Sequence, residues 1–274
     1  MAASPSVTQP AVHSLYQQVS FPVFDGNYPT AARPNIPSSG WRANEPAGLS
    51  MVLDTAWDSL EPTGWAASSV PGINSIFSDA SAPQSPNNIL RHTYPAGFVG
   101  SSGGTTVYTT GNLGLTEFYT CMAVRWDPNW QAHSTGTNKL CYITGMTGGT
   151  AELFINLNTQ QAQPRIILYN QASTDLGIVY PRVAEAYVTY GDWVQIELYL
   201  SMNTAYNLAD GIVKIWVDGT LSTDISDAQF YDSAAQPGTV NGFKYEPVWG
   251  GEGGTVVSSM DLDVDHTYIS GVAA

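Results

Sequence analysis

The chain has 274 residues, with 9 basic and 23 acidic side chains and a formal net charge of −14. This inventory argues against a nucleic-acid-binding protein, because it can hardly build the basic patch that a phosphate backbone requires. No run of about eighteen apolar residues occurs, so we expect no membrane-spanning segment. Charged residues are only 12% while glycine, proline and aromatic residues are plentiful, which is typical of short strands joined by many turns.

The first fifty residues hold seven of the 17 prolines and show little periodicity beyond SFPVF at 20–24. We predict an extended N-terminal arm over 1–50, which reaches over the domain or over neighbouring protein subunits, followed by one domain over 51–274. The start lacks the basic residues and apolar stretch of a secretory signal, yet the lysine-poor composition is typical of extracellular proteins. We therefore expect a protein located outside the cell or on the surface of a virus particle.

Strand signals follow at short intervals along the rest of the chain. The segment 51–60 could be a strand or a helical turn, and 61–88 is predicted as loop. About ten strands separated by turn residues predict an all-β, antiparallel two-sheet sandwich. The predicted strands are 88–94, 113–126, 138–145, 151–158, 164–171, 176–180, 193–201, 211–218, 240–249 and 256–269.

The clearest pattern lies between residues 192 and 219. Apolar residues alternate with polar or aromatic ones over 193–201 and again over 211–218, which indicates two half-buried strands. The polar stretch between them reads as a hairpin loop, so we predict that the two strands pair. The side chains opposite the apolar set are Trp193, Gln195, Glu197, Tyr199, Lys214 and Trp216.

The two cysteines, Cys121 and Cys141, lie in strand candidates that flank one turn-rich loop. If these strands form an antiparallel hairpin, the two cysteines sit nearly opposite each other. Their position predicts either a cross-strand disulfide or a pair of buried, reduced thiols.

Four stretches together resemble the concanavalin A-like jelly roll, nearest to its polysaccharide-lyase-like and lectin-like members. In chain order they are ILRHTYPAGFVGSSGG, LTEFYTCMAVRWDPNWQAHSTGTNKLCYITG, GDWVQIELYLSMNTAYNLADGIVKIWVDG and DLDVDHTYIS. The resemblance covers residues 88–270 and implies an antiparallel jelly-roll sandwich. It is specific to the fold and not to an activity.

If the central hairpin shares a concave sheet with 151–158 and 164–171, aromatic rings and planar polar groups line a sugar-binding groove. The alternative is that these outward rings are covered by the N-terminal arm or by a neighbouring subunit. The candidate carbohydrate-binding residues are Gln195, Glu197, Tyr199, Lys214 and Trp216.

A catalytic interpretation depends on a short match. Arg165, Tyr169 and Gln171 resemble the arginine, tyrosine and glutamine that alginate-lyase-like jelly rolls place in their groove. The RxELR and Gln-Ile-His signatures of those lyases are absent, and so is the ExDxxE pattern of jelly-roll glucanases. The sequence therefore favours a protein that is not an enzyme, with a lyase as the catalytic alternative.

Three aspartates, Asp261, Asp263 and Asp265, alternate along the last predicted strand. Carboxylates this close repel each other unless a cation lies among them, which makes a structural calcium site one hypothesis and a solvated acidic edge the other. The four histidines show no zinc-binding spacing. We expect no cofactor, or a structural calcium ion.

The function favoured by the sequence is a non-catalytic surface or decoration subunit of a larger particle such as a virus capsid. The arm would attach it to neighbouring subunits, and the concave sheet would bind glycans. The alternative is a secreted polysaccharide lyase or glycoside hydrolase of the same fold.

Overall fold

The computed structural model describes residues 40–68, 72–85, 87–100, 107–148, 153–160, 163–170 and 178–274. Over these ranges it contains β-strands and no α-helix, which confirms the all-β prediction. Residues 1–39 of the predicted arm, with the SFPVF segment at 20–24, lie outside the described residues. The strands are β1 Ser50–Thr55, β2 Ala66–Ser68, β3 Asn74–Phe77, β4 Ile89–Tyr94, β5 Val107–Trp126, β6 Asn138–Thr144, β7 Leu153–Asn158, β8 Arg165–Asn170, β9 Ile178–Val179, β10 Val194–Ser201, β11 Gly211–Val217, β12 Thr220–Ala228, β13 Val240–Trp249 and β14 Met260–Ala273.

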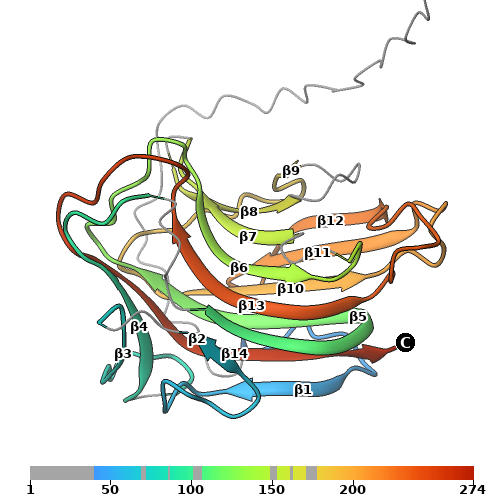
Figure 1. Ribbon diagram of the computed structural model, residues 1–274, viewed down its shortest axis with the longest axis horizontal. Coiled ribbons are helices and arrows are strands. Elements are labelled where there is room, and N and C mark those ends of the chain that lie inside the picture. The colour runs from blue at the N-terminus through green and yellow to red at the C-terminus, as the bar shows by residue number, and fades with distance from the viewer. Residues whose placement is uncertain are drawn as a thin grey trace, which may run out of the picture. The chain divides into compact units, whose positions relative to one another are not determined.

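The strands form two antiparallel layers that share β5 (Figure 1). The first half of β5 pairs with β2 and β13, and β13 leads on through β6, β7 and β8 to β9. The second half of β5 pairs with β10 and β14. β10 leads on through β11 to β12, whereas β14 pairs with β1 and, along another part, with β4, which pairs with β3. The architecture is the predicted jelly-roll sandwich.

A bend in β5 carries this strand from one layer to the other. Asn112 and Gly114 lie between its two halves, and both adopt positive φ, 60° and 58°. Asparagine and glycine tolerate this left-handed conformation best, so these two positions allow a strand of 20 residues to turn the corner.

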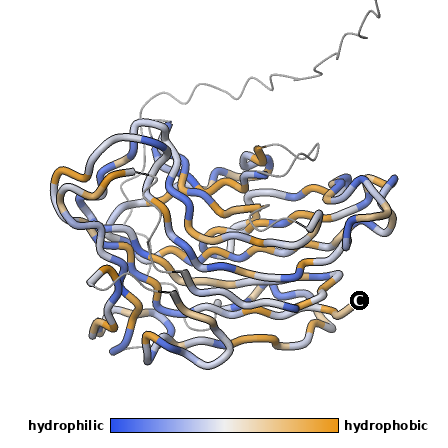
Figure 2. Tube along the Cα trace, in the orientation of Figure 1, coloured by the Kyte–Doolittle hydropathy of each residue, from blue (hydrophilic) through white to orange (hydrophobic). Residues whose placement is uncertain are grey.

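The hydrophobic core fills the space between the layers. In β10 the side chains of Val194, Ile196, Leu198 and Leu200 are fully buried, as the period of two predicts. Apolar and polar residues alternate along many of the strands in Figure 2. Burial of one apolar face per sheet is the main stabilising contribution in such a sandwich.

The central hairpin is confirmed, and the next strand was missed. Strands β10 and β11 pair antiparallel with Leu198 opposite Ile215. Asp218 and Gly219 both have positive φ and form a two-residue turn that leads directly into β12. The predicted strands leave out 220–228, a largely polar segment whose alternation is weak.

The predicted cysteine hairpin does not form. Strand β13 lies between β5 and β6, so Cys121 pairs with neighbours on β10 and β14 whereas Cys141 pairs with β13 and β7. Both are buried free thiols, one on the outer side of its sheet and one in the core between the sheets. The loop was mistaken for a hairpin because a strand distant in sequence inserts there.

Among the described residues, no helix has the length and apolar character needed to span a bilayer.

Candidate functional site

The sandwich has two outward faces, and its own chain covers one of them. We call residues 40–49 the strap and the outward side of β10, β5 and β14 the strap face. Trp41 and Leu49 pack on a cluster of Tyr119, Tyr199 and Tyr268 on this face. The strap belongs to the predicted arm. The structure therefore shows the alternative in which the N-terminal arm covers the outward aromatic rings.

Glu197 is the centre of the strap face and is completely buried. Its carboxylate accepts hydrogen bonds from the Asn44 backbone N–H and side-chain amide, both at 3.0 Å. It also accepts from the Tyr119 hydroxyl at 2.6 Å and from the Gln195 amide at 2.9 Å. These four hydrogen bonds offset the free-energy cost of burying the carboxylate, and two of the four donors belong to the strap.

The other predicted sugar-binding residues share this side of the molecule. Gln195 and Tyr199 are 1% and 9% exposed, while Trp216 packs against the tyrosine cluster. Lys214 lies at the surface, 3.6 Å from Asp224. The shared groove expected from the sequence is therefore wrong in its geometry, because the hairpin and β8 face opposite sides of the sandwich.

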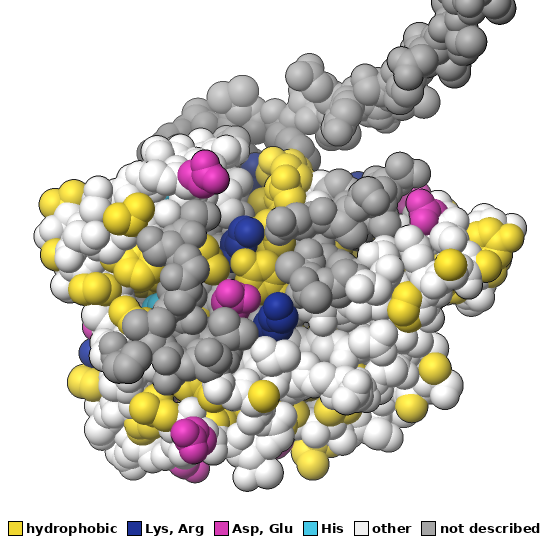
Figure 3. All heavy atoms as spheres, in the orientation of Figure 1, with side chains coloured by type: hydrophobic (Ala, Val, Ile, Leu, Met, Phe, Trp, Pro, Cys, Tyr) yellow, Lys and Arg dark blue, Asp and Glu magenta, His cyan; other side chains and the backbone are white. Residues whose placement is uncertain are grey.

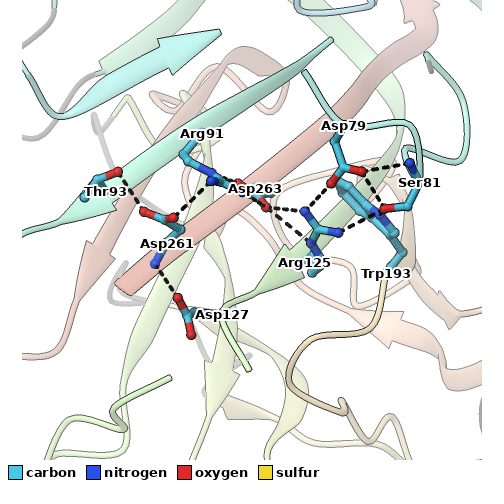
Figure 4. A network of polar contacts seen from close by, with 9 residues as sticks. All are labelled: Asp79, Ser81, Arg91, Thr93, Arg125, Asp127, Trp193, Asp261 and Asp263. Atoms are coloured by element: carbon cyan, nitrogen blue, oxygen red, sulfur yellow. Dashed lines mark hydrogen bonds and ion pairs between the residues drawn. The ribbon is translucent and has the colours of Figure 1, made fainter. Parts of the chain in front are cut away.

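Two of the three aspartates of β14, Asp261 and Asp263, form ion pairs with arginines (Figure 4). Asp263 accepts from Arg91 Nε at 2.8 Å and from an Arg125 guanidinium nitrogen at 2.6 Å. Asp261 lies 3.3 Å from Arg91, and its carboxylate accepts from the Thr93 hydroxyl at 2.7 Å. The cation that these carboxylates require is supplied by guanidinium groups.

Asp265 does not lie with Asp261 and Asp263, because the pairing of β14 with β5 shifts between Val264 and His266. It is buried, and its carboxylate accepts from the backbone N–H groups of Gln84 and Ser85. Burial raises the pKa of Asp265 despite these hydrogen bonds. No group of three potential metal ligands occurs within the described ranges, and the structural calcium ion stays a prediction.

The second outward face remains partly open. We call it the lysine face: the outward side of β13, β6, β7 and β8, with Lys139, Lys244, Glu246, Tyr169 and Arg165 partly exposed. Basic and acidic side chains gather near the middle of the side shown in Figure 3, among apolar ones.

One row of side chains crosses this face from strand to strand. Lys244 of β13 is paired with Tyr142 of β6, which is paired with Phe154 of β7, and Phe154 with Tyr169 of β8. The Phe154 and Tyr169 rings are stacked, with centroids 4.7 Å apart and planes 19° from parallel. The row therefore has the ammonium group of Lys244 at one end. At the other end is the ring of Tyr169, which stacks on the Phe154 ring.

A break in register brings Lys139 into the same site. The pairing of β6 with β7 shifts between Lys139 and Cys141, and both Leu140 and Cys141 turn into the core. Lys139 and Tyr142 therefore share one face although they are three residues apart. The Lys139 Nζ lies 5.5 Å from the Tyr142 ring centroid and 4.7 Å from that of Phe154.

This environment changes two proton affinities in opposite directions. Burial lowers the pKa of Lys139, and the nearby Glu246 carboxylate opposes this effect only in part. Burial raises the pKa of Tyr142, helped by the charge of Glu246 and by Cys141. The site thus holds an amine that loses its proton more readily than usual beside a phenol that keeps its proton.

Two of the three residues named for a lyase lie on the lysine face. Tyr169 closes the transverse row, and Arg165 of the same strand contacts Glu185 at 3.3 Å and the Tyr180 ring at 5.2 Å. Gln171 lies outside the described residues. The sequence arguments missed Lys139, Tyr142, Lys244 and Glu246, because strict alternation cannot place residues on either side of a bulge.

Comparisons with known proteins identify the fold. No protein-family model and no curated protein matches the sequence. The solved structure of Cip1, a cellulose-induced protein, is similar with a TM-score of 0.53 at 13% identity, over 81% of this chain and 99% of that one. An endo-β-1,4-glucuronan lyase from the fungus Trichoderma reesei gives 0.52 at 17%, over 82% and 96%. Alginate lyase vAL-1 from a Chlorella virus gives 0.51 at 11%, over 76% and 93%.

These similarities confirm the jelly-roll sandwich that the sequence predicts. At such low identity they show the fold alone.

Proposed function

We propose that the protein is a polysaccharide lyase that cleaves a uronate-containing polymer at the lysine face. The observation that carries this proposal is the pair formed by Lys139 and Tyr142, whose pKa values burial moves apart beside a second cation, Lys244. Pairs of titratable groups with opposite shifts are typical of acid–base sites. The jelly-roll neighbours described as lyases of glucuronan and alginate support the same reaction class.

The reaction is a β-elimination. A base removes the proton at C5 of the uronate, the C4–O4 bond breaks, and a double bond forms between C4 and C5. The C5 proton becomes acidic enough only if a cation or hydrogen-bond donor stabilises charge on the adjacent carboxylate. The departing O4 takes up a proton from an acid, which completes the balance of atoms and charge.

The described residues supply one group for each task. Lys139, with its lowered pKa, is the base, because a larger fraction of it is neutral near physiological pH than of an ordinary lysine. Tyr142, with its raised pKa, keeps its proton and donates it to the leaving oxygen. Lys244, opposite Tyr142 in the register, holds the uronate carboxylate.

The particle-decorating subunit remains a prediction with less support. Its anchor was expected in residues 1–50, and the described part of that segment packs on its own sandwich through Asn44 and Glu45. A polymeric substrate is met outside the cell, so the proposed activity is compatible with the extracellular location expected from the composition.

The test is an elimination assay on uronate polymers, which reads the ultraviolet absorbance of the new double bond. We expect Lys139→Met to reduce the rate by about 10²- to 10⁴-fold, the usual contribution of a general base. Lys214→Met, on the other sheet, is the matched control and should retain the wild-type rate. The rate should rise with pH through the range in which Lys139 loses its proton.

The absence of unsaturated products from every uronate polymer would refute the proposal, and so would a Lys139→Met variant as active as the wild type.

A further inference from the structure

Building on the proposed lyase function, we infer that the lysine face selects a uronate flanked by neutral sugars, and that Glu246 is the residue that disfavours homopolymers of uronate. The substrate class would be an acidic heteropolysaccharide in which charged units are separated by uncharged ones.

The first argument is the charge of the site. The described acidic and basic side chains at its centre, apart from the neutral phenol of Tyr142, are Lys139, Lys244 and Glu246. Arg165, further along the face, is engaged with Glu185. With Lys139 protonated the centre has one excess positive charge, which a single substrate carboxylate matches. Once Lys139 acts as the neutral base, no positive charge is left for a second carboxylate.

The second argument is the position of Glu246. It follows Lys244 by two residues on β13, on the same side of the strand, because Phe243 and Tyr245 turn into the core. Its charge acts on both Lys139 and Tyr142, so it lies close to the proposed reaction centre. A second uronate next to the bound one would bring its carboxylate toward Glu246, and like charges repel. A hydroxyl of a neutral sugar can instead donate a hydrogen bond to it.

The third argument is the aromatic end of the row. Tyr169 lies three strands from Lys244, roughly 14 Å at the usual spacing between neighbouring strands. Its ring is partly exposed and is fixed by stacking on Phe154. A ring held in this way suits the C–H face of an uncharged sugar.

The fourth argument is the net charge of the whole chain. With a net charge of −14, the protein repels a uniformly charged polyanion at long range. A polymer with widely spaced carboxylates suffers less from this repulsion. The local and the global charge therefore favour the same class of substrate.

The experiment compares two kinds of polymer with the full chain. Alginate and polyglucuronate carry a carboxylate on every sugar, whereas deacetylated gellan has glucuronate flanked by neutral sugars. We expect the wild type to produce double bonds on gellan at least about tenfold faster, per unit of uronate, than on either homopolymer. Glu246→Gln should shift the ratio of the two rates about tenfold toward the homopolymers.

The comparison of rates is made at the pH optimum of each variant, because Glu246 also acts on the pKa of Lys139. Asp224→Asn removes the same charge from the sheet that bears the strap face, and it should leave the ratio of rates unchanged. A wild type that prefers the homopolymers, or a ratio that Glu246→Gln does not move, would overturn the inference.

Binding measurements separate this inference from the proposed function. Calorimetric titration with short gellan and alginate fragments reports selectivity without requiring cleavage. Tighter binding of the gellan fragment without double bonds from any polymer would refute the lyase while leaving the selectivity of the face in place. Equal binding of both fragments would refute the selectivity.

Discussion

The lysine face and the strap face are built in the same way, from strands that turn every second side chain outward. On the strap face, the buried Glu197 carboxylate meets four donors and residues 40–49 cover it. On the lysine face, Lys139, Lys244 and Glu246 stay partly exposed. Alternation therefore identifies outward side chains, while the covering segment decides which of them can meet a ligand. Substitutions on the strap side should change stability, and those on the lysine face should change activity.

The largest expected effect on stability is at Asp263, which lies on the strap side of the molecule. Asp263→Ala leaves Arg91 and Arg125 without their shared carboxylate, which is only 5% exposed. Because Arg91 keeps Asp261 and Arg125 keeps Asp79, the free energy of unfolding should fall by about 3 kcal/mol, the lower end of the loss for a broken buried ion pair, as measured by urea denaturation. Asp224→Ala, which breaks an exposed pair with Lys214, is the control and should cost less than about 1 kcal/mol. Equal losses for both variants would contradict the contrast.

The interior between the faces should respond to acid through His92. Burial lowers the pKa of His92 to about 3, and neither ring nitrogen has a partner among the described residues. Below an unfolded pKa of about 6.5, the unfolded chain takes up a proton that the folded chain refuses. Stability should therefore fall by about 1.4 kcal/mol per pH unit as the pH drops from about 6 to 4.

His92→Leu should remove this part of the acid sensitivity, as measured by denaturation at several pH values. An unchanged slope would mean that His92 is protonated in the folded protein.

A smaller effect is expected where the strap is attached. Glu197→Gln replaces an acceptor oxygen by an NH₂ group, so at least one of the four donors loses its acceptor. The loss should be about 2 kcal/mol, with faster hydrogen exchange at the Asn44 amide. Elimination activity should stay at the wild-type level, because the lysine face is on the other side. A loss of activity with an intact strap would show that the two faces are coupled.

The smallest expected effect tests the aromatic end of the lysine face. Tyr169→Ala removes a ring that stacks on Phe154, and it should raise KM by about fivefold, roughly 1 kcal/mol, with little change in kcat. Tyr206→Ala, at an exposed tyrosine in the loop after β10, serves as the control. A fall in kcat without a change in KM would assign Tyr169 to the chemical step instead.

The fold could be predicted largely from the period-two pattern. The bounds 240–249 expected for one strand are those of β13, and β10 pairs with β11 as the hairpin predicted. The missed strands β2, β3 and β12 are short or polar, so they depend on pairing partners distant in sequence. Alternation carries no information about such partners.

The candidate site was predicted only in part. Arg165 and Tyr169 lie on the lysine face, to which we assign the proposed activity. Lys139 could not be placed because the bulge after it shifts the alternation, and a bulge leaves no clear signal in the sequence. Gln195 and Glu197 were correctly placed on an outward face, but the strap that buries them lacks the regular pattern of a strand.

The position of the strap has a practical consequence for immobilising the protein. Gly40 accepts a hydrogen bond from Gln195 and so lies against the strap face. A tether or fusion joined through the preceding residues meets the described domain on that side. A tether joined directly at Gly40 should therefore leave the partly exposed Lys139 facing the bulk solution, where a long polymer can reach it.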